Sequence, residues 1–278
     1  MQPPRIRPMT PADVDPVAAA FVREGWGDRR LTLEFMTRHA EAHPFVADDG
    51  GTVVGTGLVT LNGPVGWIAT IWVEPGWRRR GVGRALTRAT IETAEDAGCR
   101  TLLLVATEVG RPLYESLGFE VQTWYRILEA PGLADEPTDP RIRSYRPSDL
   151  PAMAALSTLA TGEDRMHLLA AFASPETALC LVRGDGTLGG FVVRAPWGGA
   201  STIAPRLDEA EAILHARRVR RGAEQRIRAG LLAENEAGLE RLLSTGWTES
   251  WRAPRLIRGD PLRWQPEAIF GQFNFGLG

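Results

Sequence analysis

The sequence has few cysteines, no long apolar run and little net charge. Its 278 residues carry a formal charge of −2, which argues against a nucleic-acid-binding protein that relies on a general basic field. No apolar run approaches the ~20 residues that a membrane span needs, and residues 1–7 lack the apolar core of a signal peptide. We therefore expect a soluble cytoplasmic protein with no membrane or nucleic-acid partner.

Disulfides and metal sites are also not expected. Cys99 and Cys180 lie in opposite halves, in apolar or helix-ending contexts that are typical of reduced, buried thiols. His167 and His215 lie in predicted helices without the companions that a metal site requires. We interpret both histidines as structural.

The length suits two domains of about 130 to 140 residues each, and the chain contains an internal repeat. Residues 5–14 are echoed by residues 141–150, and residues 107–119 are echoed in the same order by residues 235–247. Between the repeats, residues 129–140 hold three prolines and four acids, which favour neither helix nor strand. We predict domains at 1–128 and 141–278 joined by a linker at 129–140; two unrelated domains are the alternative.

The pattern of the first half predicts an α/β fold with a mixed sheet. Alternating and β-branched residues predict strands at 52–61 and 65–73, joined as a hairpin by the turn at 62–64. Apolar positions recur at helical spacing over 83–97, and Gly98 follows as a C-terminal cap. A buried strand at 100–106, a short helix at 111–117 and a last strand at 119–127 complete this half.

The chemistry of the first half is concentrated in the connection at residues 74–83. It places three arginines and two glycines, Gly81 and Gly83, directly before a helix. The first turn of a helix leaves about four N–H groups without partners, and glycines let an anion approach them. The pattern favours a diphosphate site over a solvated basic turn. The separation from the strand disfavours a dinucleotide fingerprint, and no Gly-Lys-Ser/Thr follows to make a nucleoside triphosphate site.

Two motifs in this half resemble the GNAT superfamily of acyltransferases. Arg78-Arg79-Arg80-Gly81-Val82-Gly83, preceded by Val73-Glu74-Pro75, is similar to the family's cofactor motif, and Tyr114-Glu115-Ser116-Leu117-Gly118-Phe119 is similar to its later aromatic motif. The resemblance covers residues 5 to 128. The run 106–114 looks like a bacterial branch built from two tandem domains. One departure is Thr107, which stands where many members have an asparagine that contacts pantetheine.

The resemblance implies acetyl-CoA as co-substrate, no metal, and two tandem GNAT-like domains, each a mixed, mostly antiparallel twisted sheet flanked by helices. It implies that the pyrophosphate lies on N–H groups from Arg79 to Arg84 and that pantetheine runs beside the strand near Ile71 to Val73. Tyr114 would protonate the departing thiolate. The implied cofactor-binding residues are Ile71, Trp72, Val73, Arg78, Arg79, Arg80, Gly81, Val82, Gly83, Arg84, Thr107 and Gly110.

The general base remains open at this stage. The strands at 65–73 and 100–106 carry no inward carboxylate. The candidates are Glu24, Asp28, His39, a water chain, and the carboxylate of Gly278 at the end of an apolar tail that we expect to dock. The tail would either wall the acceptor pocket or complete the second sheet.

The second half is expected to lack the cofactor site. Where the first half has its glycine loop, the second has Asp208, Glu209 and Glu211 at a helix start, which would repel a diphosphate. Leu242 takes the place of Tyr114, and the basic run 217–221 is interpreted as a solvated helix end.

Two functions are compatible with these patterns. The first is an N-acetyltransferase acting on a small-molecule or peptidyl amine, as a monomer or homodimer. The second is a non-catalytic acyl-CoA-binding sensor or interaction module.

Overall fold

The computed structural model describes residues 2–278 and contains one set of elements twice. The first half consists of β1 (Arg5–Pro8), α1 (Val14–Arg23), α2 (Arg30–Met36), β2 (Ala42–Asp49), β3 (Thr52–Asn62), β4 (Val65–Val73), α3 (Val82–Asp96), β5 (Thr101–Val105), α4 (Arg111–Glu115) and β6 (Glu120–Pro131). The second half consists of β7 (Ile142–Ser144), α5 (Leu150–Thr161), α6 (Met166–Phe172), β8 (Ala178–Val182), β9 (Leu188–Arg194), β10 (Ala200–Ile203), α7 (Leu207–Arg221), β11 (Arg226–Leu232), α8 (Glu236–Ser244) and β12 (Thr248–Gly259), followed by β13 (Ile269–Gly271). The order β-α-α-β-β-β-α-β-α-β is the same in both, which confirms the predicted tandem repeat.

An ion pair explains the first sequence echo. Arg7 binds the carboxylate of Asp13 at 2.8 Å, and Arg143 binds Asp149 at 2.7 Å. Both aspartates also accept a hydrogen bond from a backbone N–H three residues earlier. The two arginines thus fix each first strand to the start of the following helix.

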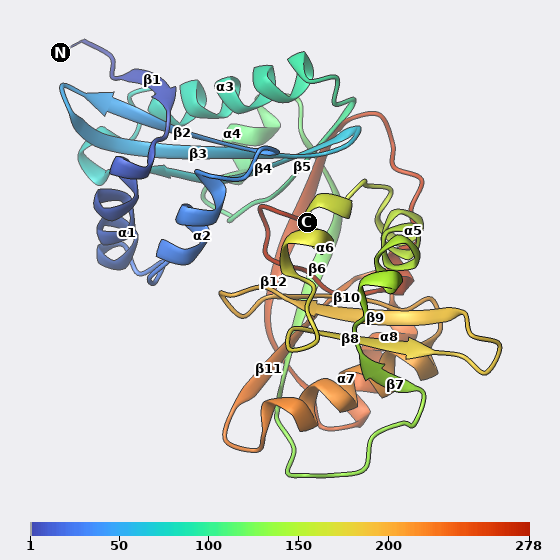
Figure 1. The fold of residues 1–278 in the computed structure, drawn as a ribbon. Coiled ribbons are helices and arrows are strands. Elements are labelled where there is room, and N and C mark those ends of the chain that lie inside the picture. Colours follow the sequence, from blue (N-terminus) through green and yellow to red (C-terminus); the bar gives the residue numbers. More distant parts are fainter. Residues whose placement is uncertain (1) are drawn as a thin grey trace.

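The two halves exchange their last strands. The eight-stranded sheet has the order β1-β2-β3-β4-β5-β12-β6-β11, so β12 of the second half pairs with β5 of the first. Conversely, β6 of the first half pairs with β11 of the second. The long β6 and β12 lie side by side between the halves (Figure 1). The eight-stranded sheet is therefore built from strands of both halves.

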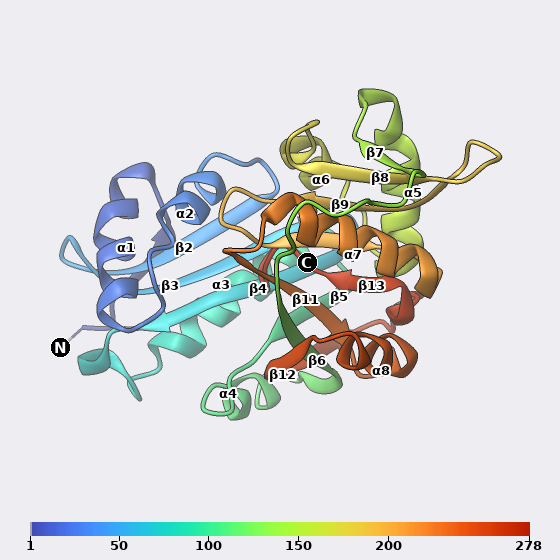
Figure 2. The same ribbon diagram turned by 90° about the horizontal axis from the view of Figure 1, so that it is seen from below.

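The sheet is mixed because β4 and β5 are parallel while the other pairs are antiparallel. In the first half, α3 covers one face and α1 and α2 cover the other (Figures 1 and 2). None of the helices within residues 2–278 is long and apolar enough to cross a membrane.

The chain's last segment completes the second sheet, which has the order β13-β10-β9-β8-β7. Phe270, Phe273 and Leu277 are at most 1% exposed, so the tail docks as expected. The side chain of Gln272 donates to the carbonyl of Gly230 in β11 at 2.9 Å. The tail therefore lies between β10 and β11, the two strands that correspond to β4 and β5 of the first half.

Most predicted elements of the first half are present, with three differences. The hairpin of β3 and β4, helix α3 with Gly98 after it, and strand β5 are confirmed. Strand β2 and helix α2 were not predicted. The expected linker begins too early, because residues 129–131 still belong to β6 and pair with β11. The division into domains at this segment stays a prediction, and the main sheet runs across it.

Candidate active site

A gap between β4 and β5 forms the centre of the site. Their parallel pairing is confined to Val65–Trp67 and Thr101–Leu103. Beyond Trp67, β4 continues to Val73 without a partner strand on that side in the described chain. An extended ligand can therefore use the backbone groups of this stretch as a neighbouring strand would.

A distortion in β4 marks the same stretch. Thr70 has a φ of +57°, and the pairing with β3 shifts register between Thr56 and Leu58. The hydroxyl of Thr56 donates to the carbonyl of Thr70 at 2.7 Å. A non-glycine residue in the left-handed region is strained, and such bulges are frequent beside active sites. The bulge changes the direction of the backbone groups around residues 70 and 71.

The loop before α3 has the backbone geometry of an anion-binding turn. Arg79 has a φ of +61° and Gly81 a φ of +84°, and left-handed residues in such a turn direct successive N–H groups toward a common point. Gly81 caps α3, and the N–H of Ala85 is the first to bond back, to the Gly81 carbonyl at 3.0 Å. The N–H groups of the first helical turn remain for a ligand. Gly83 belongs to this first turn, and a Cβ added to it would contact the side chains of Val73 and Leu113 at 3.5 and 3.6 Å.

The arginines of this loop have distinct contacts. Arg78 donates to the carbonyl of Val73 at 2.9 Å and also binds the carboxylate of Glu24. The guanidinium of Arg80 lies 5.4 Å from the ring centre of Trp77. Arg84 donates to the hydroxyl of Ser116 at 2.8 Å, which ties α3 to α4. Arg78 thus braces the end of β4, and its predicted role as a direct cofactor ligand stays a prediction.

Tyr114 lies in α4, with its ring edge-on to Phe119 at 6.2 Å. Burial raises the pKa of its hydroxyl to about 12, so the group keeps its proton at neutral pH. The ring lies against Gly110, where an added Cβ would come within 3.4 Å of it. Thr107 accepts a hydrogen bond from the Gly110 N–H at 3.1 Å. These contacts hold a proton donor beside the end of β5.

A cavity of about 1260 Å³ lies between the halves. On the first-half side it is lined by Ala69 and Thr70 of β4, by Val105 and Thr107 at the end of β5, and by the α1–α2 region. Tail residues 271–276 form another wall. The glycine loop does not line this cavity, so an acceptor in it would reach β4 at Ala69 and Thr70 and not at the loop.

The candidate bases lie elsewhere. Glu24 binds Arg78, the carboxylate of Asp28 accepts from the N–H of Arg30, and the Nε2 of His39 lies 2.7 Å from the Nδ1 of His167. Gly278 is buried. None of these four residues lines the cavity. Tail residues 271–276 form a wall of the cavity, whereas Gly278 lies beside Glu163, Trp67 and Asn62, outside its lining.

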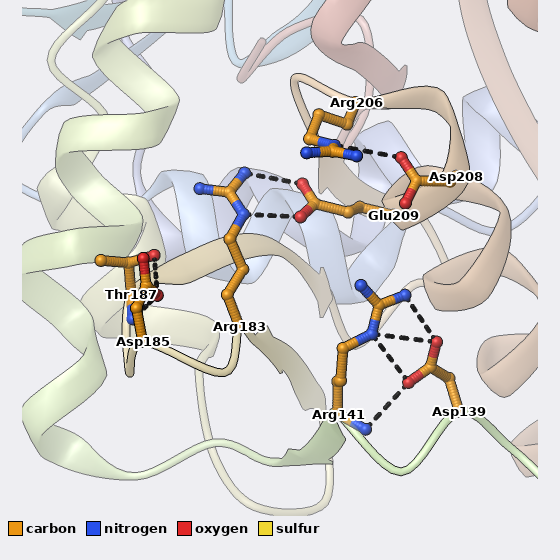
Figure 3. A network of polar contacts seen from close by, with 8 residues as sticks. All are labelled: Asp139, Arg141, Arg183, Asp185, Thr187, Arg206, Asp208 and Glu209. Atoms are coloured by element: carbon orange, nitrogen blue, oxygen red, sulfur yellow. Dashed lines mark hydrogen bonds and ion pairs between the residues drawn. The ribbon is translucent and has the colours of Figure 1, made fainter.

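The corresponding site in the second half is closed. Figure 3 shows Arg183 bound to Glu209 and Arg206 bound to Asp208 around the start of α7. Glu211 is paired with Arg241. Strand β13 lies in the gap beside β10, and Leu242 is buried in α8. The acids expected to repel a diphosphate are thus paired with arginines, and the tail occupies the groove.

Residues 13–119, which contain the glycine loop and Tyr114, match the model of the Acetyltransferase (GNAT) family. Over 114 residues the chain is 42% identical to aminoglycoside N(6')-acetyltransferase type 1 of Stenotrophomonas maltophilia, a match that covers 36% of this chain and 72% of that protein. The chain belongs to the GNAT acetyltransferase family.

Other similarities extend over both halves of this GNAT chain. It is 26% identical over 242 residues to the uncharacterized N-acetyltransferase YitH of Bacillus subtilis, covering 84% of each. Its fold matches a presumed acetyltransferase from Pyrococcus horikoshii with a TM-score of 0.84 and 19% identity, covering 100% of this chain and 97% of the other. A tandem GNAT protein from the clavulanic acid biosynthesis pathway matches with a TM-score of 0.65 and 15% identity, covering 92% and 99%. The fold is thus that of tandem GNAT proteins.

Sequence reasoning missed the arginines that line the cavity. Arg217 and Arg221, read as a solvated helix end, line it together with Arg194 and Arg228 from two strands. No local pattern links a helix end to two strands, because the tertiary fold brings them together.

Proposed function

We propose that this GNAT-family chain transfers an acetyl group from acetyl-CoA to a primary amine of a small molecule or peptide. The observation that carries the proposal is the geometry of one site. An anion-binding turn at the start of α3, an open edge of β4 and a protonated tyrosine lie along one gap, and a cavity reaches β4 at Ala69 and Thr70.

The residues would act as follows. N–H groups from Arg79 to Arg84 hold the diphosphate, and the open backbone of Ile71, Trp72 and Val73 holds the pantetheine arm. A backbone N–H of the bulged strand stabilises the acetyl oxygen as negative charge develops on it. The amine nitrogen forms a bond to the carbonyl carbon while the carbon–sulfur bond breaks. Tyr114 then gives its proton to the leaving sulfur, and the proton that the attacking nitrogen loses as the amide forms returns to Tyr114 through water.

The amine must lose a proton without help from a nearby carboxylate. The cavity contains two carboxylates, and Glu129 is bound by Arg228 at 2.6 Å and by Arg226 at 3.3 Å. These ion pairs lower the pKa of the Glu129 carboxyl, and a hydrogen bond from the Ser174 hydroxyl at 2.7 Å lowers the pKa of the Glu176 carboxyl, which makes both weak bases. Water is then the acceptor of the proton. An amine of pKa near 10.4 is neutral in roughly one part in 10³ at pH 7, equivalent to about 4.6 kcal/mol.

Two measurements test the proposal. Calorimetry should show saturable binding of acetyl-CoA, and release of free CoA should be detected with a panel of amino acids, polyamines, aminoglycosides and peptides. Aminoglycosides are included because of the Stenotrophomonas relative. Binding of acetyl-CoA without turnover of any amine would favour the sensor instead, and no binding would reject both functions.

A further inference from the structure

Positive charge is concentrated on one part of the cavity wall. Seven arginines line the cavity, from α7, β9, β11 and the α1–α2 connection, against two glutamates. They are Arg29, Arg194, Arg217, Arg220, Arg221, Arg226 and Arg228. All 32 lysine-or-arginine positions of this chain are arginines. The presence of arginine instead of lysine in the cavity therefore does not indicate a special site. The clustering of seven arginines in one cavity is informative, because the chain as a whole has a net charge of −2.

Five of these arginines, Arg29, Arg194, Arg217, Arg220 and Arg221, have no acidic partner among the described residues, whereas Arg226 and Arg228 bind Glu129. Within the described residues, the side chains of Arg194 and Arg221 have no hydrogen bond or ion pair, and the guanidinium of Arg217 donates to the carbonyl of Arg228 at 2.7 Å. Burial, with Arg221 and Arg194 nearby, lowers the pKa of Arg217 to about 10. Like charges held together in a partly buried site repel each other, and an anion relieves the repulsion.

The cluster belongs to the acceptor side of the site. The cavity that it lines reaches β4 at Ala69 and Thr70, and it does not touch the glycine loop at residues 79–83. A cofactor diphosphate on that loop would therefore leave the arginines unoccupied. Three aromatic side chains, Trp197, Phe273 and Phe275, also line the cavity.

We infer that the acceptor is an anionic amine, which places its nitrogen at β4 and a phosphate or carboxylate group on Arg194, Arg217 and Arg221. The inference rests on the proposed function and adds the substrate class. Guanidinium groups bind both anions through paired hydrogen bonds. The three aromatic side chains would contact the part of the molecule between its two ends. Polycationic amines would be repelled by the arginines.

Direct binding tests the anion site without chemistry. Inorganic pyrophosphate is titrated into the full chain at 150 mM salt, with saturating acetyl-CoA to occupy the glycine loop. The variant R194Q/R221Q removes two side chains without described contacts, so its fold should be unchanged. The control R5Q/R263Q removes the same charge from exposed positions outside the cavity. We expect saturable binding that weakens at least 10-fold in R194Q/R221Q and is unchanged in the control.

Turnover tests the substrate class. Matched acceptors are compared by kcat/KM: glucosamine 6-phosphate with glucosamine, phosphoethanolamine with ethanolamine, and glutamate with glutamine. In at least one pair, the acceptor with the additional phosphate or carboxylate should have a kcat/KM at least 10-fold higher than its matched acceptor. R194Q/R221Q should lose this preference, and R5Q/R263Q should keep it.

The outcomes separate this inference from the proposed function. Loss of pyrophosphate binding in the presence of acetyl-CoA, or equal binding by R194Q/R221Q, would overturn the anion site. Preferred turnover of neutral or polycationic amines would overturn the substrate class. Pyrophosphate binding at the arginines with no acetyl-CoA binding would instead reject the proposed function and leave the anion site standing.

Discussion

At the scale of single residues, Tyr114 carries the most specific chemical role. It lies in α4 beside Gly110, and burial raises the pKa of its hydroxyl to about 12. A group with so high a pKa is a proton donor and not a base at any pH at which the protein would be assayed. The sequence motif placed this residue, whose ordinary pKa near 10 already keeps the hydroxyl protonated at neutral pH; the burial that raises this pKa further comes from packing that no motif records.

Tyr114→Phe should lower kcat by about 10² to 10⁴, the usual effect of losing a general acid. Affinity for acetyl-CoA should change little, because the ring and its contact with Phe119 remain. Steady-state kinetics with calorimetry would measure both. Tyr145→Phe, a buried tyrosine of the second half, is the matched control and should turn over at nearly the wild-type rate. Equal activity of both variants would assign Tyr114 to packing alone.

A second residue-scale feature is the pair His39 and His167. Their rings are stacked at 5.0 Å and joined by a hydrogen bond of 2.7 Å between the halves, and His167 also bonds to Asn62. Burial and the neighbouring His39 lower the pKa of His167 to about 4. His39, expected as a candidate base, is thus part of a contact between the halves.

The pair should make stability depend on pH. Because the pKa of His167 is depressed on folding, the unfolded chain binds more protons between about pH 6.5 and 4, so the free energy of unfolding falls as the pH drops. After allowance for partial exposure of the ring, we expect a loss of about 1 kcal/mol between pH 7 and 5. Urea unfolding of His167→Gln should lack this loss, and His215→Gln should retain it. An unchanged pH dependence in His167→Gln would contradict the assignment.

At the scale of elements, the start of α3 combines backbone geometry with chemistry. Gly81 and Gly98 lie at opposite ends of this helix with φ values of +84° and +85°, and an added Cβ would meet nothing within 4 Å at either position. The two glycines therefore have the same backbone conformation and the same open space, and only Gly81 stands at the N-terminal end of the helix.

Gly81→Glu should abolish acetyl-CoA binding, at least a 100-fold loss, because a carboxylate would face the diphosphate. Gly98→Glu is the control, since both changes carry the same left-handed strain of about 1 kcal/mol. The midpoint of thermal unfolding should shift by the same amount in the two variants. Calorimetry should show a loss of acetyl-CoA affinity in Gly81→Glu only. Similar affinities of the two variants for acetyl-CoA would show that the cofactor does not bind at this loop.

The elements also show what could be predicted from the sequence. Helix α3 and the hairpin of β3 and β4 follow from strong local periodicity and clear turn residues. Strand β2 was missed because Pro44 and the two acids at its end are poor strand residues. The partners of β6 and β12 could not be predicted, because each strand's pattern specifies that it pairs and not with which strand.

At the scale of the whole molecule, the exchange of β6 and β12 makes each half depend on the other. The edge of β5 is covered by a strand of the second half, and β11 is covered by a strand of the first. The cavity is likewise shared between the halves. The site therefore requires both repeats, although the cofactor motifs lie in one.

The full chain should unfold in a single cooperative transition despite its two repeats. Calorimetry should give a van't Hoff enthalpy equal to the measured enthalpy. Leu231 in β11 and Leu103 in β5 are both fully buried. Leu231→Ala and Leu103→Ala should each lower the free energy of unfolding of this one transition by about 2 to 5 kcal/mol. Two separated transitions, each sensitive to one variant, would show that the repeats unfold independently.

The exchanged strands β6 and β12 should hold the two halves together even if the chain between the halves is cleaved. The segment at 132–140, between β6 and β7, is mostly solvent-accessible, and a protease could cleave it. The two fragments would remain attached, since β6 and β12 each leave their own fragment and complete the sheet of the other. A nicked molecule would thus behave as a non-covalent heterodimer. Its cavity would stay intact until a denaturant separated the strands.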